Sequence, residues 1–95
     1  MNVKHNATIV KVQGKGLTIV DPQPDCTYIE SINVRPEHRR QGLATAMLNK
    51  VFEVFPPPYH LHVSVTNYTA IALYKKLGFR MTTRTFRNLR LMIKD

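Results

Sequence analysis

The segment from residue 31 to residue 55 predicts a strand, a basic loop and a helix in immediate succession. Ser31-Ile32-Asn33-Val34 suits a strand, and Arg35-Pro36 ends it because proline lacks a backbone donor and keeps the preceding residue out of the helical region. From Gly42 to about Phe55 the spacing predicts a helix. Its apolar positions are Leu43, Met47, Val51 and Val54, and its polar stripe contains Thr45, Asn49 and Glu53.

The start of this helix has the chemistry of an anion site. The first turn of a helix has unpaired N–H groups and partial positive charge, which favour phosphate. Gly42 has no Cβ and Ala44 has a small side chain, so a pyrophosphate could approach the backbone, and Arg39 and Arg40 add charge. The alternative is a glycine that only shapes a turn, beside solvated arginines. The preceding strand, the spacing and the charge together favour the anion site.

The segment before residue 31 predicts three strands that lead into this motif. Residues 7–12 and 17–20 read as a hairpin around Gly14-Lys15-Gly16. Residues 21–25 read as a loop because of their two prolines, and residues 26–34 form a long strand. Together they place three strands before the first helix.

After Pro56-Pro57-Pro58, residues 59–65 alternate as a strand. One face carries His60, His62 and Ser64, and the other carries Leu61, Val63 and Val65. Two histidines at this spacing could bind a metal, but no third ligand is evident, so we predict no metal site. A polar strand face near a cleft explains the pair, and His62 could point into a substrate groove.

Residues 67–78 predict a second helix. Asn67 is its N-cap, and Gly78 is the left-handed residue after its end, with Phe79 folding back onto the last turn. Its apolar face contains Ala70, Leu73, Tyr74 and Leu77. Residues 79–85 and 89–93 read as closing strands with solvated arginines, so the order is β-β-β-α-β-α-β-β, an α/β (α+β) fold class.

Composition indicates one domain over residues 1–95, with 43% hydrophobic residues. We expect a cytoplasmic protein, because the N-terminus lacks a secretory signal, no apolar run approaches membrane-spanning length, and Cys26 is the single cysteine. Cys26 reads as a small buried or half-buried hydrophobe. Fourteen Lys and Arg against six Asp and Glu give a formal charge of +8, which predicts attraction to a polyanion such as nucleic acid or an acidic protein face.

Two motifs resemble those of the GNAT superfamily of N-acetyltransferases. Arg39-Arg40-Gln41-Gly42-Leu43-Ala44 resembles the superfamily's (Arg/Gln)-x-x-Gly-x-(Gly/Ala) signature, which binds the pyrophosphate of acetyl-coenzyme A. Asn67, Ala70, Leu73-Tyr74 and Leu77-Gly78-Phe79 are similar to its other common motif. The resemblance covers Tyr28 to the C-terminus well and the first 25 residues poorly. It implies a mixed, mostly antiparallel sheet flanked by two helices, in an N-terminally shortened member.

The resemblance also implies roles for individual residues. It assigns cofactor contact to Ile32, Asn33, Val34, Arg39, Arg40, Gln41, Gly42, Leu43, Ala44, Thr45 and Asn67. Tyr74 matches a tyrosine that often acts as general acid, with core packing as the alternative. Glu30 is the candidate general base, with a surface or structural carboxylate as the alternative; alternation puts it on one side of the strand with Tyr28 and Ile32 unless a bulge intervenes.

We therefore expect an N-acetyltransferase that moves an acetyl group from acetyl-coenzyme A to a primary amine, on a lysine or N-terminus of a protein. The alternative is a module on the same scaffold that binds acyl-coenzyme A, nucleic acid or protein without turnover. The helices that usually wall the acceptor site are expected to be missing, which suits an amine delivered by a macromolecule. A homodimer could instead supply that wall, so both monomer and homodimer remain open, and no membrane partner is expected.

Overall fold

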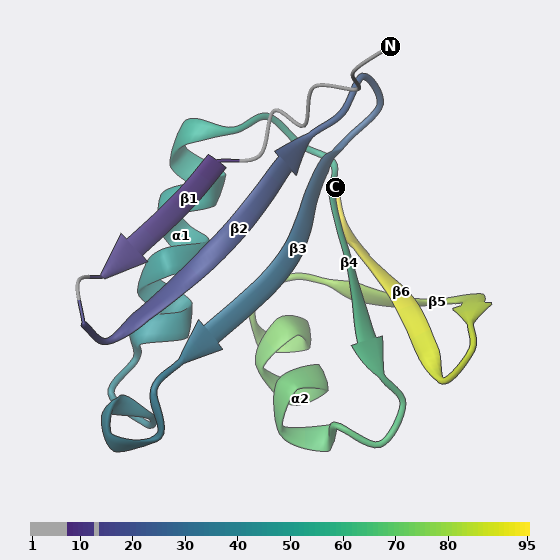
Figure 1. Ribbon diagram of the computed structural model, residues 1–95. Helices are drawn as coiled ribbons and strands as arrows, with labels where there is room; N and C mark the ends of the chain where they lie inside the picture. Colours follow the sequence, from purple (N-terminus) through teal and green to yellow (C-terminus); the bar gives the residue numbers. More distant parts are fainter. Residues whose placement is uncertain (1–7, 13) are drawn as a thin grey trace, which may run out of the picture.

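The computed structural model describes residues 8–12 and 14–95 (Figure 1). Its strands are β1 (Thr8–Val12), β2 (Gly16–Pro22), β3 (Thr27–Val34), β4 (Tyr59–Ser64), β5 (Arg80–Phe86) and β6 (Leu89–Lys94). Its helices are α1 (Leu43–Val54) and α2 (Tyr68–Lys76), and a 3₁₀ turn, η1, covers Pro36–His38. The predicted order of strands and α-helices is confirmed. Asp21 and Pro22, predicted as loop, instead end β2, where they pair with Tyr28 and Thr27 of β3.

The six strands form one mixed sheet in the order β1-β2-β3-β4-β6-β5. All neighbouring pairs are antiparallel except β3 and β4, which run parallel. This parallel pair is joined only at Thr27–Tyr59, Tyr28–His60 and Ile29–Leu61. Beyond Ile29 and Leu61 the two strands diverge, and α2 lies beside the gap (Figure 1). The predicted mixed, mostly antiparallel sheet is confirmed.

A single hydrophobic core lies between the sheet and the two helices. Its buried members come from β2, β3, β4, β6, α1 and the turn between α2 and β5: Val20, Ile29, Leu48, Val51, Tyr59, Leu61, Val63, Phe79 and Met92. Half-buried side chains of α2 pack against it. The predicted alternation is confirmed within β4, because Leu61 and Val63 are buried while His62 is exposed. Its continuation to Val65 is wrong, because Val65 follows the end of β4 and is 39% exposed.

Helix α1 begins after Gly42 and ends at Val54, before the run of prolines. The predicted core position of Val54 is wrong, because its side chain is 58% exposed. The buried stripe is centred instead on Leu48 and Val51, with Phe55 packed at its end. At about 100° per residue, a stripe with this centre places Val54 at its solvent edge.

Helix α2 has the predicted ends. The side-chain oxygen of Asn67 accepts a hydrogen bond from the Ala70 N–H at 3.2 Å. At the other end Gly78 has a φ of +99°. The N–H of Phe79 donates to the Tyr74 carbonyl at 2.9 Å, and the N–H of Gly78 donates to the Lys75 carbonyl at 3.1 Å. These bonds form the Schellman closure that a glycine permits.

In the described residues, neither helix is long and apolar enough to cross a membrane. Cys26 is half-buried and its thiol is free, as expected for a small hydrophobe with no disulfide partner.

Candidate active site

A groove of about 750 Å³ runs between the end of β3, the start of α1 and the start of α2. Ten of the eleven residues predicted to contact a cofactor line it: Ile32, Asn33, Val34, Arg39, Arg40, Gly42, Leu43, Ala44, Thr45 and Asn67. Gln41 is exposed and does not line it. The structure adds His38, Thr69, Ala70 and Leu73 to the lining. Ala70 and Leu73 were predicted only as part of the apolar face and motif of the second helix, and the orientation of η1 and α2 that turns these four residues to the groove is set by the fold.

The start of α1 is open to an incoming group. No side chain caps its first turn. Gly42 has a φ of +77°, in the left-handed region that favours glycine, and a Cβ built there would meet nothing within 4 Å. Arg39 Nε donates to the Val34 carbonyl at 3.0 Å, which ties the basic loop to the end of β3. The first-turn N–H groups and the guanidinium groups therefore face a space large enough for a phosphate.

A second cavity, of about 170 Å³, lies where β3 and β4 separate. It shares Ile32, Asn67 and Tyr74 with the groove, so the two spaces adjoin through these side chains. Glu30 also lines this cavity. The structure therefore brings the predicted general acid and the predicted general base to one small space.

A β-bulge decides the position of Glu30. Ile19 pairs with Ser31 and Val20 pairs with Ile29, so Glu30 has no partner residue in the ladder between β2 and β3. The extra residue reverses the alternation, and Ile32 packs against the core on the same side as Ile29. This bulge is the stated exception to the alternation expected for Tyr28, Glu30 and Ile32, so the three side chains do not share one side of the strand, and Glu30 stays exposed at the mouth of the cavity.

Tyr74 lies between the groove and the second cavity. Its ring packs edge-on against Phe79, with the ring centroids 5.9 Å apart. Burial raises the pKa of the Tyr74 phenol above its ordinary value. The hydroxyl therefore holds its proton at neutral pH and is able to donate it.

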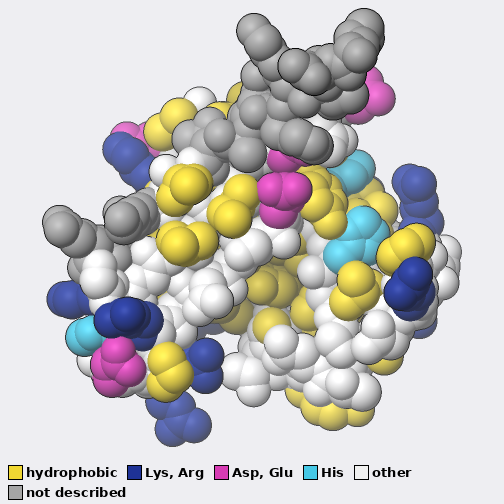
Figure 2. Space-filling view, viewed as in Figure 1, with side chains coloured by type: hydrophobic (Ala, Val, Ile, Leu, Met, Phe, Trp, Pro, Cys, Tyr) yellow, Lys and Arg dark blue, Asp and Glu magenta, His cyan; other side chains and the backbone are white. Residues whose placement is uncertain are grey.

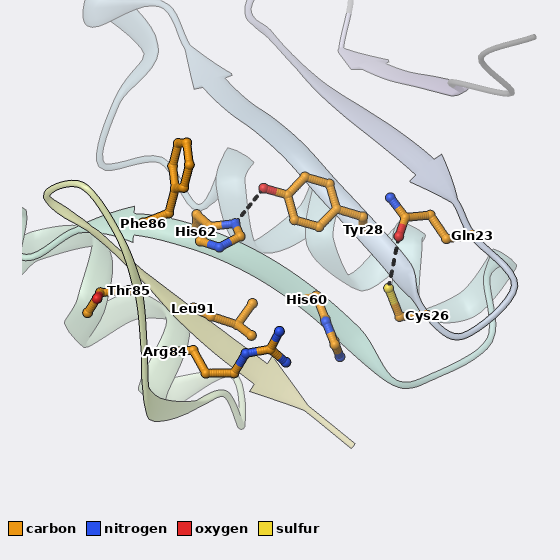
Figure 3. Close-up of a pocket in the computed structure, with 9 residues that line it drawn as sticks. All are labelled: Gln23, Cys26, Tyr28, His60, His62, Arg84, Thr85, Phe86 and Leu91. Atoms are coloured by element: carbon orange, nitrogen blue, oxygen red, sulfur yellow. Dashed lines mark hydrogen bonds between the residues drawn. The ribbon is translucent and has the colours of Figure 1, made fainter. Parts of the chain in front are cut away.

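A third cavity, of about 410 Å³, opens beside the second one and is drawn in Figure 3. His62 lines both. Its Nδ1 is 2.7 Å from the Tyr28 hydroxyl, and the two side chains point toward one another (Figure 3). Burial raises the pKa of Tyr28, and the nearby Glu30 carboxylate raises it further.

Among the described residues, no three His, Cys, Asp or Glu side chains lie close enough together to hold a metal ion, and this includes the histidine pair of β4. His60 and His62 instead line the third cavity. Burial lowers the pKa of His60, and the positive charge of Arg84 lowers it further. The predicted polar strand face near a cleft matches this arrangement. Figure 2 shows histidine side chains over the region of β4 on the sheet face turned to the viewer.

Comparisons with known proteins agree with this fold. The chain is 41% identical over 58 residues to an N-alpha-acetyltransferase of Saccharolobus solfataricus. The aligned region covers 56% of this chain and 35% of the relative. It is also 37% identical over 54 residues to an aminoglycoside 2'-N-acetyltransferase of Mycolicibacterium fortuitum. This aligned region covers 57% of this chain and 28% of the relative. The matches therefore span about a third of these curated relatives' lengths.

Solved structures show the same fold. One is a PaiA N-acetyltransferase from Thermoplasma acidophilum in complex with coenzyme A. It has a TM-score of 0.80 at 16% identity, over 85% of this chain and 53% of that one. Another is Arabidopsis thaliana Naa50 in complex with the bisubstrate analogue CoA-Ac-MVNAL. It has a TM-score of 0.72 at 23% identity, over 85% of this chain and 65% of that one.

The family match is broader than the two sequence motifs indicated. The model of the Acetyltransferase (GNAT) family matches residues 9–79. The match takes in β2 and all but the first residue of β1, so it extends into the first 25 residues, where the resemblance was expected to be poor. It ends before β5 and β6, which the resemblance was expected to cover well. Because the match covers most of the chain and the fold agrees with it, the protein belongs to the GNAT family of acetyltransferases.

Proposed function

We propose that this protein is an N-acetyltransferase that moves an acetyl group from acetyl-coenzyme A to a primary amine on a protein. One observation carries the proposal: the groove at the start of α1 adjoins, through Tyr74, the small cavity that Glu30 lines. A phosphate-binding helix end, a proton donor and a proton acceptor are the three elements that the reaction needs.

The groove fits the cosubstrate. The first turn of α1 and the loop before it would hold the pyrophosphate, because Gly42 leaves the backbone accessible and Arg40 adds positive charge. Ile32, Asn33 and Val34 would contact the pantetheine arm from β3, which pairs here with β2 but has no partner on the side of β4 because the two strands have separated. Asn67 would contact it from the start of α2. When bound, acetyl-coenzyme A supplies an activated thioester.

Two proton transfers accompany acetyl transfer. Nitrogen forms the new bond to the acetyl carbon, the carbon–sulfur bond breaks, and Tyr74 donates its hydroxyl proton to the departing thiolate. The amine must also lose a proton. Glu30 is able to accept it directly or through a water. The Tyr28–His62 pair is a second acceptor: Tyr28 oxygen takes the amine proton as its own hydroxyl proton passes to His62 Nδ1.

A protein N-terminus is the acceptor that the relatives favour. Several of them are named N-alpha-acetyltransferases, and the Naa50 structure contains a peptide-like bisubstrate analogue. The aminoglycoside and thialysine acetyltransferases among the relatives keep small amines as the competing class. Binding without turnover is the other alternative, which the formal charge of +8 suits.

The test measures free thiol release from acetyl-coenzyme A with peptides, polyamines and aminoglycosides as acceptors, together with calorimetric binding of the cosubstrate. Gly42→Glu is expected to abolish binding and turnover, because the side chain adds volume and negative charge at the pyrophosphate position. Gly14→Glu is the matched control: its φ of +72° imposes the same backbone strain, and Gly14 lies in the turn before β2, outside the groove.

Unchanged affinity in Gly42→Glu would overturn the assignment of the groove. Tight binding of acetyl-coenzyme A without thiol release for any amine would favour the binding module over the enzyme.

A further inference from the structure

The third cavity has a basic end that acetyl transfer itself does not require. His60 and Arg84 line this end, and Figure 3 shows the Arg84 guanidinium extending toward the His60 ring. In the part of the chain that the structure describes, the ion pairs are Arg35–Glu37, Lys50–Glu53 and Arg80–Asp95, so Arg84 has no carboxylate partner. No Asp or Glu is among the described residues that line the cavity.

An irregularity in β5 positions Arg84. Met81 pairs with Met92 and Thr85 pairs with Arg90, so three residues of β5 lie opposite Leu91 alone. Thr82 Oγ1 donates to the Leu91 carbonyl at 2.7 Å and accepts from the Arg84 N–H at 3.2 Å. A bulge of this kind changes the direction of a side chain relative to a regular strand. Here the half-buried Thr82 hydroxyl holds the bulge, and Arg84, the last residue of the bulge, lines the cavity.

An acidic side chain and a basic side chain lie toward opposite ends of this face of the sheet. Glu30 lies near Tyr28, at the end that adjoins the second cavity, and its charge acts on the Tyr28 phenol. Arg84 lies at the other end, where burial and then the charge of Arg84 lower the pKa of His60; the Asp95 carboxylate, which is paired with Arg80, acts on it in the opposite direction. A ligand with an ammonium group at the Glu30 end and a carboxylate at the Arg84 end therefore has complementary charges.

We propose that Arg84 and His60 form a subsite for a carboxylate on the acceptor, so that the preferred substrate is a peptide with an acidic side chain close to its reacting N-terminus. This inference rests on the proposed function and adds the substrate class. A strand rises about 3.3 Å per residue, so His60 and His62 are about 7 Å apart along β4. An extended acceptor with its amine beside His62 would reach Arg84 with the side chain of its second or third residue.

The test uses three peptides that are identical except for Asp, Asn or Lys at the second residue, and repeats the series at the third. Thiol release measures turnover, and fluorescence anisotropy of labelled peptides with coenzyme A present measures binding. The wild-type protein is expected to bind the Asp peptide roughly 3- to 10-fold more tightly than the Asn peptide, as for a charge-assisted contact at a partly exposed site. The difference should appear in KM rather than kcat, because the contact is remote from the reacting atoms.

Arg84→Gln should remove the preference for Asp and leave activity on the Asn peptide within about 2-fold of wild type. Arg84→Lys should retain part of the preference, which also shows that the site still folds. Arg84→Glu should reverse it in favour of Lys. Lys76→Gln is the matched control, because it removes the same charge from an exposed position on α2 that lines none of the three cavities.

The two readouts separate this inference from the proposed function. Thiol release with equal affinity for the three peptides, or an Asp preference that survives Arg84→Gln, overturns the subsite and leaves the enzyme in place. Arg84-dependent binding of the Asp peptide without thiol release supports the subsite and overturns the enzyme. A preference that Lys76→Gln also removes would assign the effect to net charge and overturn the subsite.

Discussion

Tyr74 links three properties in one side chain: it lies on the predicted face of α2, lines both the groove and the cavity between β3 and β4, and has a raised pKa from burial. Tyr74→Phe keeps the ring against Phe79 and removes the hydroxyl. We expect the free energy of unfolding to change little and kcat to fall about 10²- to 10⁴-fold, the usual contribution of a general acid. Single-turnover kinetics and urea unfolding measure the two effects.

The general-acid role of Tyr74 would be contradicted if Tyr74→Phe transfers the acetyl group at the wild-type rate under conditions where this transfer limits turnover. The tyrosine would then be a packing residue, and the thiolate would take its proton from solvent.

The two candidate proton acceptors, Glu30 and the Tyr28–His62 pair, can be separated at the residue scale, because each can be removed without changing the other. Glu30→Gln and His62→Gln each remove one acceptor and preserve most of the side-chain volume. We expect kcat to fall about 10²-fold or more in whichever variant loses the operating base. Tyr28→Phe distinguishes a relay from a direct role of His62, since it removes the 2.7 Å partner of Nδ1.

If both glutamine variants retain the wild-type rate, neither residue is the base, and a water must accept the amine proton. If only Tyr28→Phe and His62→Gln are impaired, the assignment of Glu30 from sequence is wrong.

At the scale of elements, α1 offers a matched pair of valines. Val51 is 0% exposed and Val54 is 58% exposed on the same helix. Val51→Ala should lower the free energy of unfolding by about 2 kcal/mol, since it removes two buried methyl groups and leaves a cavity. Val54→Ala should change it by less than about 0.5 kcal/mol, as at other surface positions. Urea unfolding followed by circular dichroism gives both values.

Equal losses of unfolding free energy in the two valine variants would contradict the observed buried stripe and support the stripe expected from the sequence.

The ends of the helices could be predicted from the sequence better than their buried faces. Asn67 and Gly78 act through bonds within a few residues, so their cap roles follow from local sequence. The face of α1 depends on the sheet beneath it, and for that reason Val54 was wrongly placed in the core.

At the scale of the whole molecule, two three-stranded halves meet at the short parallel pair of β3 and β4. Thr27 reinforces this junction: its buried Oγ1 donates to the Pro56 carbonyl at 2.7 Å and its N–H donates to the Pro58 carbonyl at 2.9 Å. Thr27→Val keeps the shape and removes the hydroxyl bond. We expect a loss of about 1–3 kcal/mol in the free energy of unfolding.

Thr18→Val is the control for Thr27, because Thr18 is equally buried but its hydroxyl has, among the described residues, only the Met47 sulfur as a side-chain hydrogen-bond partner, at 3.8 Å. A thioether is a weak acceptor, so the loss should stay below about 1 kcal/mol. Similar losses in both variants would show that the Thr27 bond has no special part in joining the halves.

The sequence by itself determined the order of the elements and most of the residues that line the groove at the start of α1. Strand alternation and the proline and glycine positions are local patterns, so they predict the element order. The family resemblance assigned eleven residues to the cofactor, and ten of these line the groove. The tertiary structure decided the rest. The bulge at Glu30, the approach of Tyr28 to His62 and the placement of Arg84 depend on which strands pair and in which register. Register between strands distant in sequence is set by long-range packing, which no local pattern encodes.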